Sequence, residues 1–401
     1  MADFGGAELD AFRAEARDWL EANVPQSIRG DTAAANRFAG AEKPEGDHLL
    51  WKQRMGEKGW GVPTWPAAYG GGGLSAAEAR VLNQELDRIG AYNPIMGMGV
   101  SMFGPTLLEY GTEEQKARHV PPIVRGELRW CQGYSEPGAG SDLASLQTRA
   151  EDKGDHWSVS GQKVWTSGAQ WADWCFCLVR TDPSKKHEGI SFVLIDMHQP
   201  GVEVRPIKLI AGNSPFCETF FDGARVEKND MLGPLNGGWT IGKRLLQHER
   251  AGQGGSRLTG GGPKEVAELA KRYVGVDERG RLADDDLRAR LSRYQMDARA
   301  HGLTIERARA EAKGNSSPSA TTSVMKNSST WIGQTRAELL IEIMGHQGLG
   351  WQGDDFEDAE LEAVRGWLGG KAWTIFGGSQ EIQNNIVSKR ILGLPDTTAS
   401  S

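Results

Sequence analysis

The segment Trp130-Cys-Gln-Gly-Tyr-Ser-Glu-Pro-Gly-Ala-Gly-Ser-Asp142 joins an extended run to a turn rich in glycine and proline. Tyr134 and Ser135 end the extended run, and the residues after them force a turn because proline fixes its φ angle and glycine permits unusual ones. Such a turn brings backbone N–H groups and hydroxyls close to a flat or anionic ligand. From composition alone, a Gly-Pro turn that caps the next helical turn is the simpler interpretation.

Short runs rich in β-branched and aromatic residues follow this segment, and Gly, Pro, Asp and Asn separate them. This pattern predicts a small antiparallel sheet structure. The runs cover residues 157–160, 163–166, 174–179, 190–195 and 218–221.

Helical periodicity dominates on both sides of the predicted sheet. Ser75 and Thr112 each stand three residues before a Glu or Gln, a spacing that is typical of capping boxes at helix starts. The helical period returns after Trp239 and continues to about Leu392. We therefore expect three domains with a ligand cleft where they meet. They are an α-helical domain at 1–125, a β-domain at 126–235 and a second α-helical domain at 236–401.

Composition excludes several classes of protein. The chain has 401 residues, of which 38% are hydrophobic and 25% charged, so it is neither disordered nor fibrous. A formal net charge of −7 and the lack of a supporting motif argue against nucleic-acid binding. No apolar stretch approaches the roughly 18 residues of a membrane span. Because the start of the chain also lacks a signal-peptide pattern, we expect a cytoplasmic protein.

The four cysteines predict neither disulfides nor a metal site. Cys175 and Cys177 lie in a predicted strand, where a period of two places both thiols on one face. A zinc site would need a second pair of ligands, and no pair has suitable spacing. We expect these thiols to pack in the core.

Several motifs, in the same order, resemble those of the acyl-CoA dehydrogenase family of flavoproteins. The segment 130–142 resembles the first signature of that family. The resemblance covers nearly the whole chain and is specific because distant motifs support one another. They are the Gly-Trp…Trp-Pro…Gly-Gly stretch near 60–72, Lys163-Val-Trp-Thr-Ser167, Gly238-Trp239 and Gly378-Ser-Gln-Glu-Ile-Gln383.

The resemblance implies an α-helical domain, a central β-domain and a C-terminal four-helix bundle, with FAD between the last two. Ser141 matches a position near the CoA chain. Glu381 replaces an amide that many members carry, so it needs a donor partner near a phosphate. The residues matched to FAD contacts are Gln132, Tyr134 and Ser135 at the isoalloxazine, Trp165 and Ser167 beside the flavin ring, and Ser379 and Glu381 at its phosphate and adenosine side. Core packing is the alternative for Trp165.

The family reaction needs a carboxylate that removes the α-proton of an acyl thioester while flavin N5 accepts the β-hydride. Many members supply it from a Tyr-Glu-Gly turn, which here reads Phe376-Gly377-Gly378 and lacks the base. Some members carry the base on an earlier helix, where Glu249 falls on the matching position. Arg250 beside it is expected to orient the substrate or balance charge. The alternative for Glu249 is a surface glutamate paired with an arginine.

Gly377 has a further implied role, because its backbone N–H matches the group that holds the thioester carbonyl. The missing side chain also leaves space, so we expect a branched, ring-bearing or otherwise bulky acyl group. The implied product is the trans-2-enoyl-CoA, formed in fatty-acid or lipid catabolism, and the implied electron acceptor is an electron-transfer flavoprotein.

Two motifs that contact the neighbouring subunit's FAD in many members are altered here. They read Lys271-Arg-Tyr-Val-Gly275 and Glu342-Ile-Met-Gly-His346. The chain is therefore expected to form a homo-oligomer or a heteromer with a related subunit. Two alternatives stay open, a non-catalytic flavin-binding subunit and a flavin oxidase or monooxygenase on the same fold.

Overall fold

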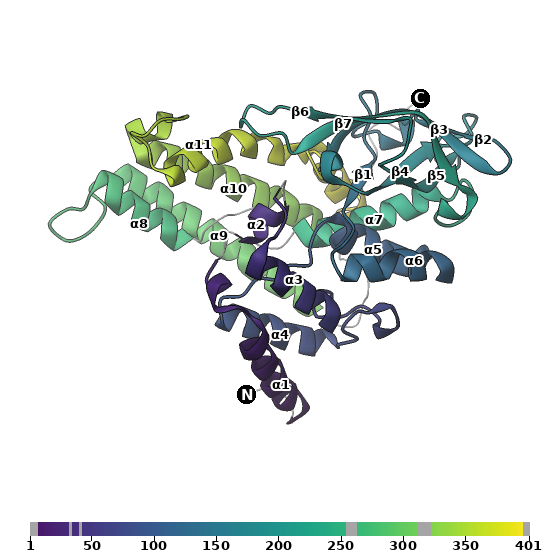
Figure 1. Cartoon of the computed structure of the whole chain (residues 1–401). Helices are drawn as coiled ribbons and strands as arrows, with labels where there is room; N and C mark the ends of the chain where they lie inside the picture. Colours follow the sequence, from purple (N-terminus) through teal and green to yellow (C-terminus); the bar gives the residue numbers. More distant parts are fainter. Residues whose placement is uncertain (1–6, 32–33, 40–41, 254–262, 312–321, 396–401) are drawn as a thin grey trace. The chain divides into compact units, whose positions relative to one another are not determined.

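The computed structural model describes residues 7–31, 34–39, 42–253, 263–311 and 322–395, and the chain divides into two compact units (Figure 1). The first unit holds the chain up to Ile207 together with Pro215–Leu246, and the second holds Lys208–Ser214 together with the chain from Gln247 onward. Among the helices of the described ranges, none is long and apolar enough to cross a membrane.

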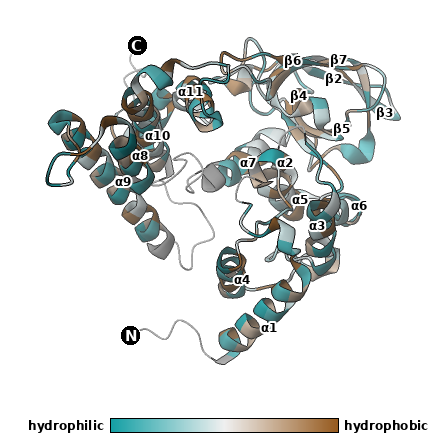
Figure 2. Ribbon diagram, turned by 60° about the vertical axis from the view of Figure 1, so that its left-hand side comes forward, coloured by the Kyte–Doolittle hydropathy of each residue, from teal (hydrophilic) through white to brown (hydrophobic). Residues whose placement is uncertain are grey.

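The N-terminal helices of the first unit pack around a core that includes the fully buried Trp51 and Phe103. Hydrophobic and hydrophilic residues are mixed along each helix, as expected where one face is buried (Figure 2). The predicted capping boxes at Ser75 and Thr112 are confirmed, and they open α4 and α6. The helices are α1 (Ala7–Asn23), α2 (Ala34–Ala39), α3 (Gly46–Lys58), α4 (Ala76–Arg88), α5 (Gly104–Tyr110) and α6 (Glu113–Val124).

The strands of the described chain form one seven-stranded sheet, in the order β1-β4-β2-β3-β7-β6, with β5 paired to β4. The strands are β1 (Trp130–Gly133), β2 (Arg149–Asp152), β3 (His156–Ser167), β4 (Trp174–Arg180), β5 (Ile190–Asp196), β6 (Val202–Ile207) and β7 (Phe216–Glu227). The expectation of an antiparallel sheet is wrong in part, because β4 runs parallel to both β1 and β2. These pairs join strands that are distant in the sequence, where no hairpin imposes an antiparallel direction.

The two faces of β4 pack against different cores. Cys175 and Cys177 are fully buried on one face, together with Cys131 of β1, and all three thiols are free. Phe176 and Leu178 point to the other face and join the core of the N-terminal helices. The prediction that the cysteines pack in the core is confirmed.

The second unit is helical, and α10 (Thr322–Met344) packs against its other helices. α7 (Gly238–Gln253) begins in the first unit and ends in the second. Buried Ile332, Leu339 and Ile343 place one part of α10 in the core of the unit. The other helices are α8 (Pro263–Val274), α9 (Asp285–Glu311), α11 (Asp358–Gly370) and α12 (Gln380–Ile386). The predicted fold class of helices, sheet and helices is confirmed.

A buried carboxylate joins α1 to α4 in the first unit. Glu85 accepts hydrogen bonds from Arg13 at 3.0 Å, from Arg17 at 3.1 Å and from Arg88 at 2.6 Å. The bond from Arg17 is the largest cause that lowers the pKa of Glu85, to about 2, although burial opposes it. The carboxylate of Glu85 therefore stays ionised in the folded protein at pH values well below the ordinary pKa of a glutamate.

This network predicts a pH dependence of stability. The folded pKa of Glu85 lies near 2 and the ordinary value is 4.5, so the stability it contributes is full above about pH 4.5 and is lost as the pH falls towards 2. Glu85→Gln is expected to lower the free energy of unfolding at neutral pH by about 1–3 kcal/mol and to flatten this acid loss. Thermal midpoints between about pH 6 and pH 3 measure both effects. The exposed Glu15→Gln on α1 is the control, and parallel curves for wild type and Glu85→Gln would contradict the assignment.

Candidate functional site

A buried ion pair fixes the glycine-rich turn to the sheet. The ammonium of Lys163 on β3 is 0% exposed and donates to Glu136 Oε1 at 2.8 Å and to the carbonyl of Tyr134 at 3.1 Å. Glu136 also accepts the backbone N–H groups of Gln147 at 2.6 Å and Thr148 at 2.9 Å. Burial alone would raise the pKa of Glu136, but the charge and hydrogen bond of Lys163, together with the hydrogen bonds of Thr148 and Gln147, lower it. The first residues of the turn therefore hold one position against β3.

Trp165 is held in an unusual conformation beside this turn. Its φ is +60°, in the left-handed region that large side chains rarely adopt, and its side chain is 55% exposed. The distortion lies where the pairing of β3 with β7 shifts register between Lys163 and Thr166. The adjacent Val164 donates its N–H to the carbonyl of Ser135 at 2.8 Å, and Phe216 meets the indole edge-on. The sheet thus exposes a large flat ring one residue after the backbone contact with Ser135, at a cost in backbone strain.

The other predicted residues of the first unit differ in exposure. Gln132 is half-buried on β1, and its Nε2 is buried with no hydrogen-bond partner among the described residues. Ser135 and Ser167 are half-buried, and Ser141 is exposed at the far end of the turn. Tyr134 is buried, with its ring edge-on to Phe176 in the core. The structure therefore bonds Ser135 to Val164, the residue before Trp165, and turns the Tyr134 ring inward.

In the second unit, two glycines and a buried amide shape the turn before α12. The φ of Gly377 is +66° and that of Gly378 is +93°. Buried Gln383 donates from Nε2 to the carbonyl of Gly377 at 3.0 Å. Ser379 caps α12 by accepting the N–H of Ile382 at 3.3 Å. Because residues with a side chain disfavour this backbone conformation, glycine at 377 relieves strain in the turn as well as removing a side chain.

A buried cation lies near this turn, on α10. Lys326 is only 6% exposed, and within the described chain its ammonium has no hydrogen-bond partner. Burial lowers its pKa, and the negative charge of Glu381 acts in the opposite direction. Asn327, the next residue, donates to Asn384 of α12 at 2.8 Å. A buried, unpaired ammonium is costly, so this end of the second unit is suited to an anionic group.

The predicted base, Glu249, and its neighbour Arg250 lie on α7. Glu249 is half-buried. The helix includes Arg250, but the side chain of Arg250 lies outside the described part of the structure. No group of three or more His, Cys, Asp or Glu residues in the described ranges is arranged to hold a metal ion.

Three charged residues of these sites had no role assigned from the sequence: Glu136, Lys163 and Lys326. For Lys163 a signal was available, since a lysine in a run of strand-forming residues needs a buried partner or an exposed face. Lys326 gave no such signal, because a single lysine on a long polar helix is ordinary.

Comparisons with known proteins place these features in one family. The domain models of the acyl-CoA dehydrogenase family match residues 6–127 as its N-terminal domain, 131–224 as its middle domain and 236–392 as its C-terminal domain. The chain is 38% identical to the acyl-CoA dehydrogenase IpdE1 of Mycolicibacterium smegmatis over 97% of this chain and 98% of that protein.

Solved structures agree. The Tcur3481-Tcur3483 steroid ACAD is 31% identical, with a TM-score of 0.77 over 98% of this chain and 99% of that one. A chain of the ChsE4-ChsE5 complex from Mycobacterium tuberculosis is 28% identical, with a TM-score of 0.75 over 99% of this chain and 100% of that one. The chain therefore belongs to the acyl-CoA dehydrogenase family, whose members are FAD enzymes, and both the predicted family and the predicted class of enzyme are confirmed.

Two substitutions at Trp165 can separate the effect of its backbone strain on stability from the effect of its ring on FAD binding. In Trp165→Gly the ring is lost and the backbone strain is relieved, whereas in Trp165→Ala the ring is lost and the strain, about 1 kcal/mol, remains. We expect both variants to bind FAD about tenfold more weakly or worse, because a stacking surface is lost. The Gly variant should unfold at a higher denaturant concentration than the Ala variant.

Fluorescence titration of the apoprotein with FAD and denaturant unfolding measure the two effects separately. Unchanged FAD affinity in both variants would show that Trp165 is not part of the cofactor wall.

Proposed function

We propose that this chain is an FAD-dependent dehydrogenase that converts an acyl-CoA thioester to the trans-2-enoyl-CoA. The observation that carries the proposal is the strained and exposed Trp165, which follows the backbone contact of Val164 with Ser135 and lies two residues from the buried Lys163–Glu136 pair. Strain of this kind persists where the surrounding structure supports a function. Family membership supplies the class of reaction.

The residues present fit the cofactor. On the first unit, the indole of Trp165, the unsatisfied Nε2 of Gln132 and the hydroxyls of Ser135 and Ser167 suit a flat ring with polar edges. On the second unit, Ser379 and the buried ammonium of Lys326 suit a phosphate. Lys326 also supplies the nearby cation that Glu381 needs beside a phosphate. Bound FAD would supply the flavin N5 that accepts the β-hydride of the substrate.

Glu249 is the proposed base, and its carboxylate oxygen takes the α-proton. A carboxylate that is partly removed from water is a stronger base than one in solution, and Glu249 is half-buried. Gly377 holds the thioester carbonyl through its backbone N–H, which stabilises the charge that develops on the oxygen. Ser141 contacts the CoA chain, and Arg250 orients the substrate or balances charge.

The base assignment predicts a selective defect. Glu249→Gln keeps the size and polarity of the side chain but cannot take a proton, so FAD binding should persist and anaerobic flavin reduction by acyl-CoA should fall by about 10³-fold or more. Stopped-flow absorbance of the flavin measures the rate. Glu268→Gln on the exposed face of α8 is the matched control, and it should behave as wild type.

Two results would redirect the proposal. Unchanged reduction in Glu249→Gln would place the base elsewhere. A wild-type protein that binds FAD but is never bleached by any acyl-CoA would support a non-catalytic subunit, and fast reoxidation by oxygen would support an oxidase or monooxygenase.

The proposed substrate carries a branched, ring-bearing or otherwise bulky acyl group. Gly377 has no side chain at the usual position of the base, which leaves space beside the reacting carbons. The similarity to a steroid ACAD points in the same direction, since the acyl groups of such an enzyme carry fused rings.

A substrate panel tests this proposal. Butyryl-, octanoyl-, isovaleryl- and steroid side-chain CoA thioesters are mixed anaerobically with the FAD-loaded protein, and the rate of flavin reduction is recorded for each. We expect the bulky thioesters to reduce the flavin at least about tenfold faster than the straight ones, a difference of about 1.4 kcal/mol in barrier height. Reduction by short straight chains alone would overturn the proposed substrate class and leave the reaction type intact.

A heteromer with a related subunit is the proposed assembly, with an electron-transfer flavoprotein as acceptor. The residues that stand in place of the family's cross-subunit motifs form ion pairs within this chain. Arg272 pairs with Glu357, and Glu342 pairs with Arg290. The solved ChsE4-ChsE5 complex is a precedent for two different chains with this fold.

A further inference from the structure

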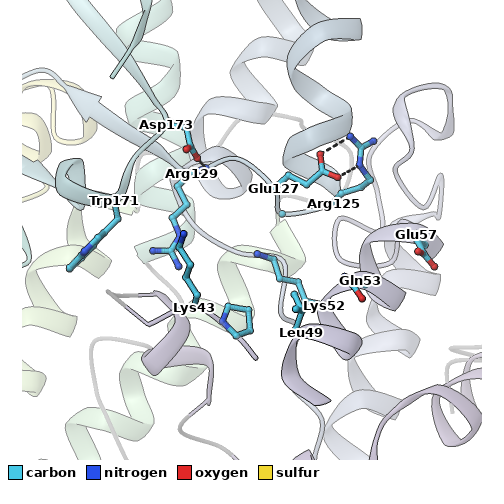
Figure 3. A pocket seen from close by; sticks show the side chains of 12 residues that line it. Lys43, Leu49, Lys52, Gln53, Glu57, Arg125, Glu127, Arg129, Trp171 and Asp173 are labelled. Carbon is cyan, nitrogen blue, oxygen red and sulfur yellow. Dashed lines mark hydrogen bonds and ion pairs between the residues drawn. The ribbon is translucent and has the colours of Figure 1, made fainter. Parts of the chain in front are cut away.

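A charged pocket of about 570 Å³ lies in the first unit, away from the residues discussed so far (Figure 3). Its walls come from α3 and the residues before it, from the loop after α6 and from the segment that leads into β4. The size lies within the range of small-molecule sites. The lining residues are Lys43, Pro44, Leu49, Lys52, Gln53, Glu57, Arg125, Gly126, Glu127, Arg129, Trp171 and Asp173.

Two of the three acidic side chains in the lining are already engaged. Glu127 forms a two-pronged pair with Arg125, at 2.5 and 2.7 Å. Asp173 accepts the backbone N–H of Arg129 at 2.7 Å and lies 3.2 Å from His198 Nε2. Glu57 lies on the opposite side of the pocket from Arg129 (Figure 3). One end of the pocket is therefore positively charged.

Lys52, Arg129 and Lys43 form this end, and the other two cations repel the charge of Lys52. Burial first, and then the charges of Arg129 and Lys43, lower the pKa of Lys52, while the charge of Glu127 acts in the opposite direction. Arg129 is held by donating from Nη2 to the carbonyl of Glu42 at 3.1 Å. Figure 3 shows the ends of Lys52 and Arg129 directed into the same space. A bound anion would relieve the repulsion among these cations.

The position of Lys52 depends on Gly126. Gly126 has a φ of +65°, and a Cβ added there would lie 2.6 Å from Lys52 Cε and 3.4 Å from its ammonium. The aliphatic chain of Lys52 therefore packs over the backbone of Gly126, just after the end of α6. This contact directs the ammonium of Lys52 into the pocket.

Trp171 adds a flat aromatic wall beside Arg129 (Figure 3). It ends η5 (Ala169–Trp171) and is half-buried. An indole next to cations is the combination that binds a base by stacking and a phosphate by charge. We propose that this pocket binds a nucleoside diphosphate group, with its phosphates at Lys52, Arg129 and Lys43 and its base on Trp171.

This pocket is separate from the proposed flavin and thioester turn. Arg129 and Asp173 stand at the starts of the parallel strands β1 and β4, whereas Tyr134 and Ser135 follow the end of β1. The length of β1 alone separates the two places by about 10 Å. The inference does not rest on the proposed function, since it uses none of the residues assigned there.

Isothermal titration of the FAD-loaded protein with ADP tests the proposal. We expect one ADP to bind per chain, and adenosine and pyrophosphate to bind more weakly than ADP because each has only half of the contacts. Lys52→Gln should weaken ADP binding about tenfold, through the loss of one charge-assisted contact. Lys58→Gln removes the same charge from the same helix outside the pocket and should leave ADP affinity unchanged.

Free nucleotide and the nucleotide end of CoA share this chemistry, so CoA is titrated in parallel. Loss of CoA binding in Lys52→Gln, with ADP affected equally, would assign the pocket to the end of a longer cofactor and support the inference. No ADP binding at millimolar concentration would overturn it. Equal binding of pyrophosphate and ADP with no effect of Trp171→Ala, or binding of a hexaglutamate peptide in place of ADP, would overturn it too.

Discussion

The buried pair between Lys163 and Glu136 is the interaction on which the first unit's site depends. The fully buried ammonium of Lys163 needs an anionic partner, so the carboxylate of Glu136 must lie beside it. Glu136 in turn uses its second oxygen on the backbone of the segment before β2. One ion pair thereby connects the glycine-rich turn after β1, the segment before β2 and strand β3, two residues before Trp165.

Around this pair, the molecule carries several features that an isolated stable domain would avoid. Trp165 is strained and exposed, Gln132 has an unsatisfied buried nitrogen, and Lys326 is a buried cation without a partner in the described residues. Each costs free energy in the folded protein, and each is of the kind that a bound ring or phosphate compensates. Trp165 and Gln132 occur at positions matched independently to the cofactor, and Lys326 lies near Glu381, which was also matched to it. This agreement is the reason to interpret the three features as functional.

The sequence could predict the parts of the fold that follow local rules. The capping boxes at Ser75 and Thr112 were readable because a hydroxyl and an acid or amide three residues apart act on their own helix. β2 and β6 were not predicted. β2 is largely charged and β6 alternates charged residues at the end of the sheet, so neither shows the apolar pattern of a buried strand. Both owe their structure to their neighbours.

The same division, between features set by local sequence and features set by tertiary neighbours, applies to the site. The motif around Trp165 identified the residue, but its left-handed backbone depends on the register shift between β3 and β7, which no single segment encodes. The inward ring of Tyr134 depends on Phe176 and Phe192, which come from two other strands. Side-chain direction at these positions is a tertiary property, whereas residue identity is a local one.

The left-handed backbone of Gly377 has a consequence for the history of this chain. A single base change in a codon converts glycine to glutamate, so a base at this turn would be easy to regain if only the side chain mattered. With φ at +66°, that change would place a side chain where the backbone conformation disfavours one, at a cost of about 1–2 kcal/mol. Under the proposed assignment to Glu249, a point mutation that restored a carboxylate at this turn would therefore have to overcome the strain of its backbone.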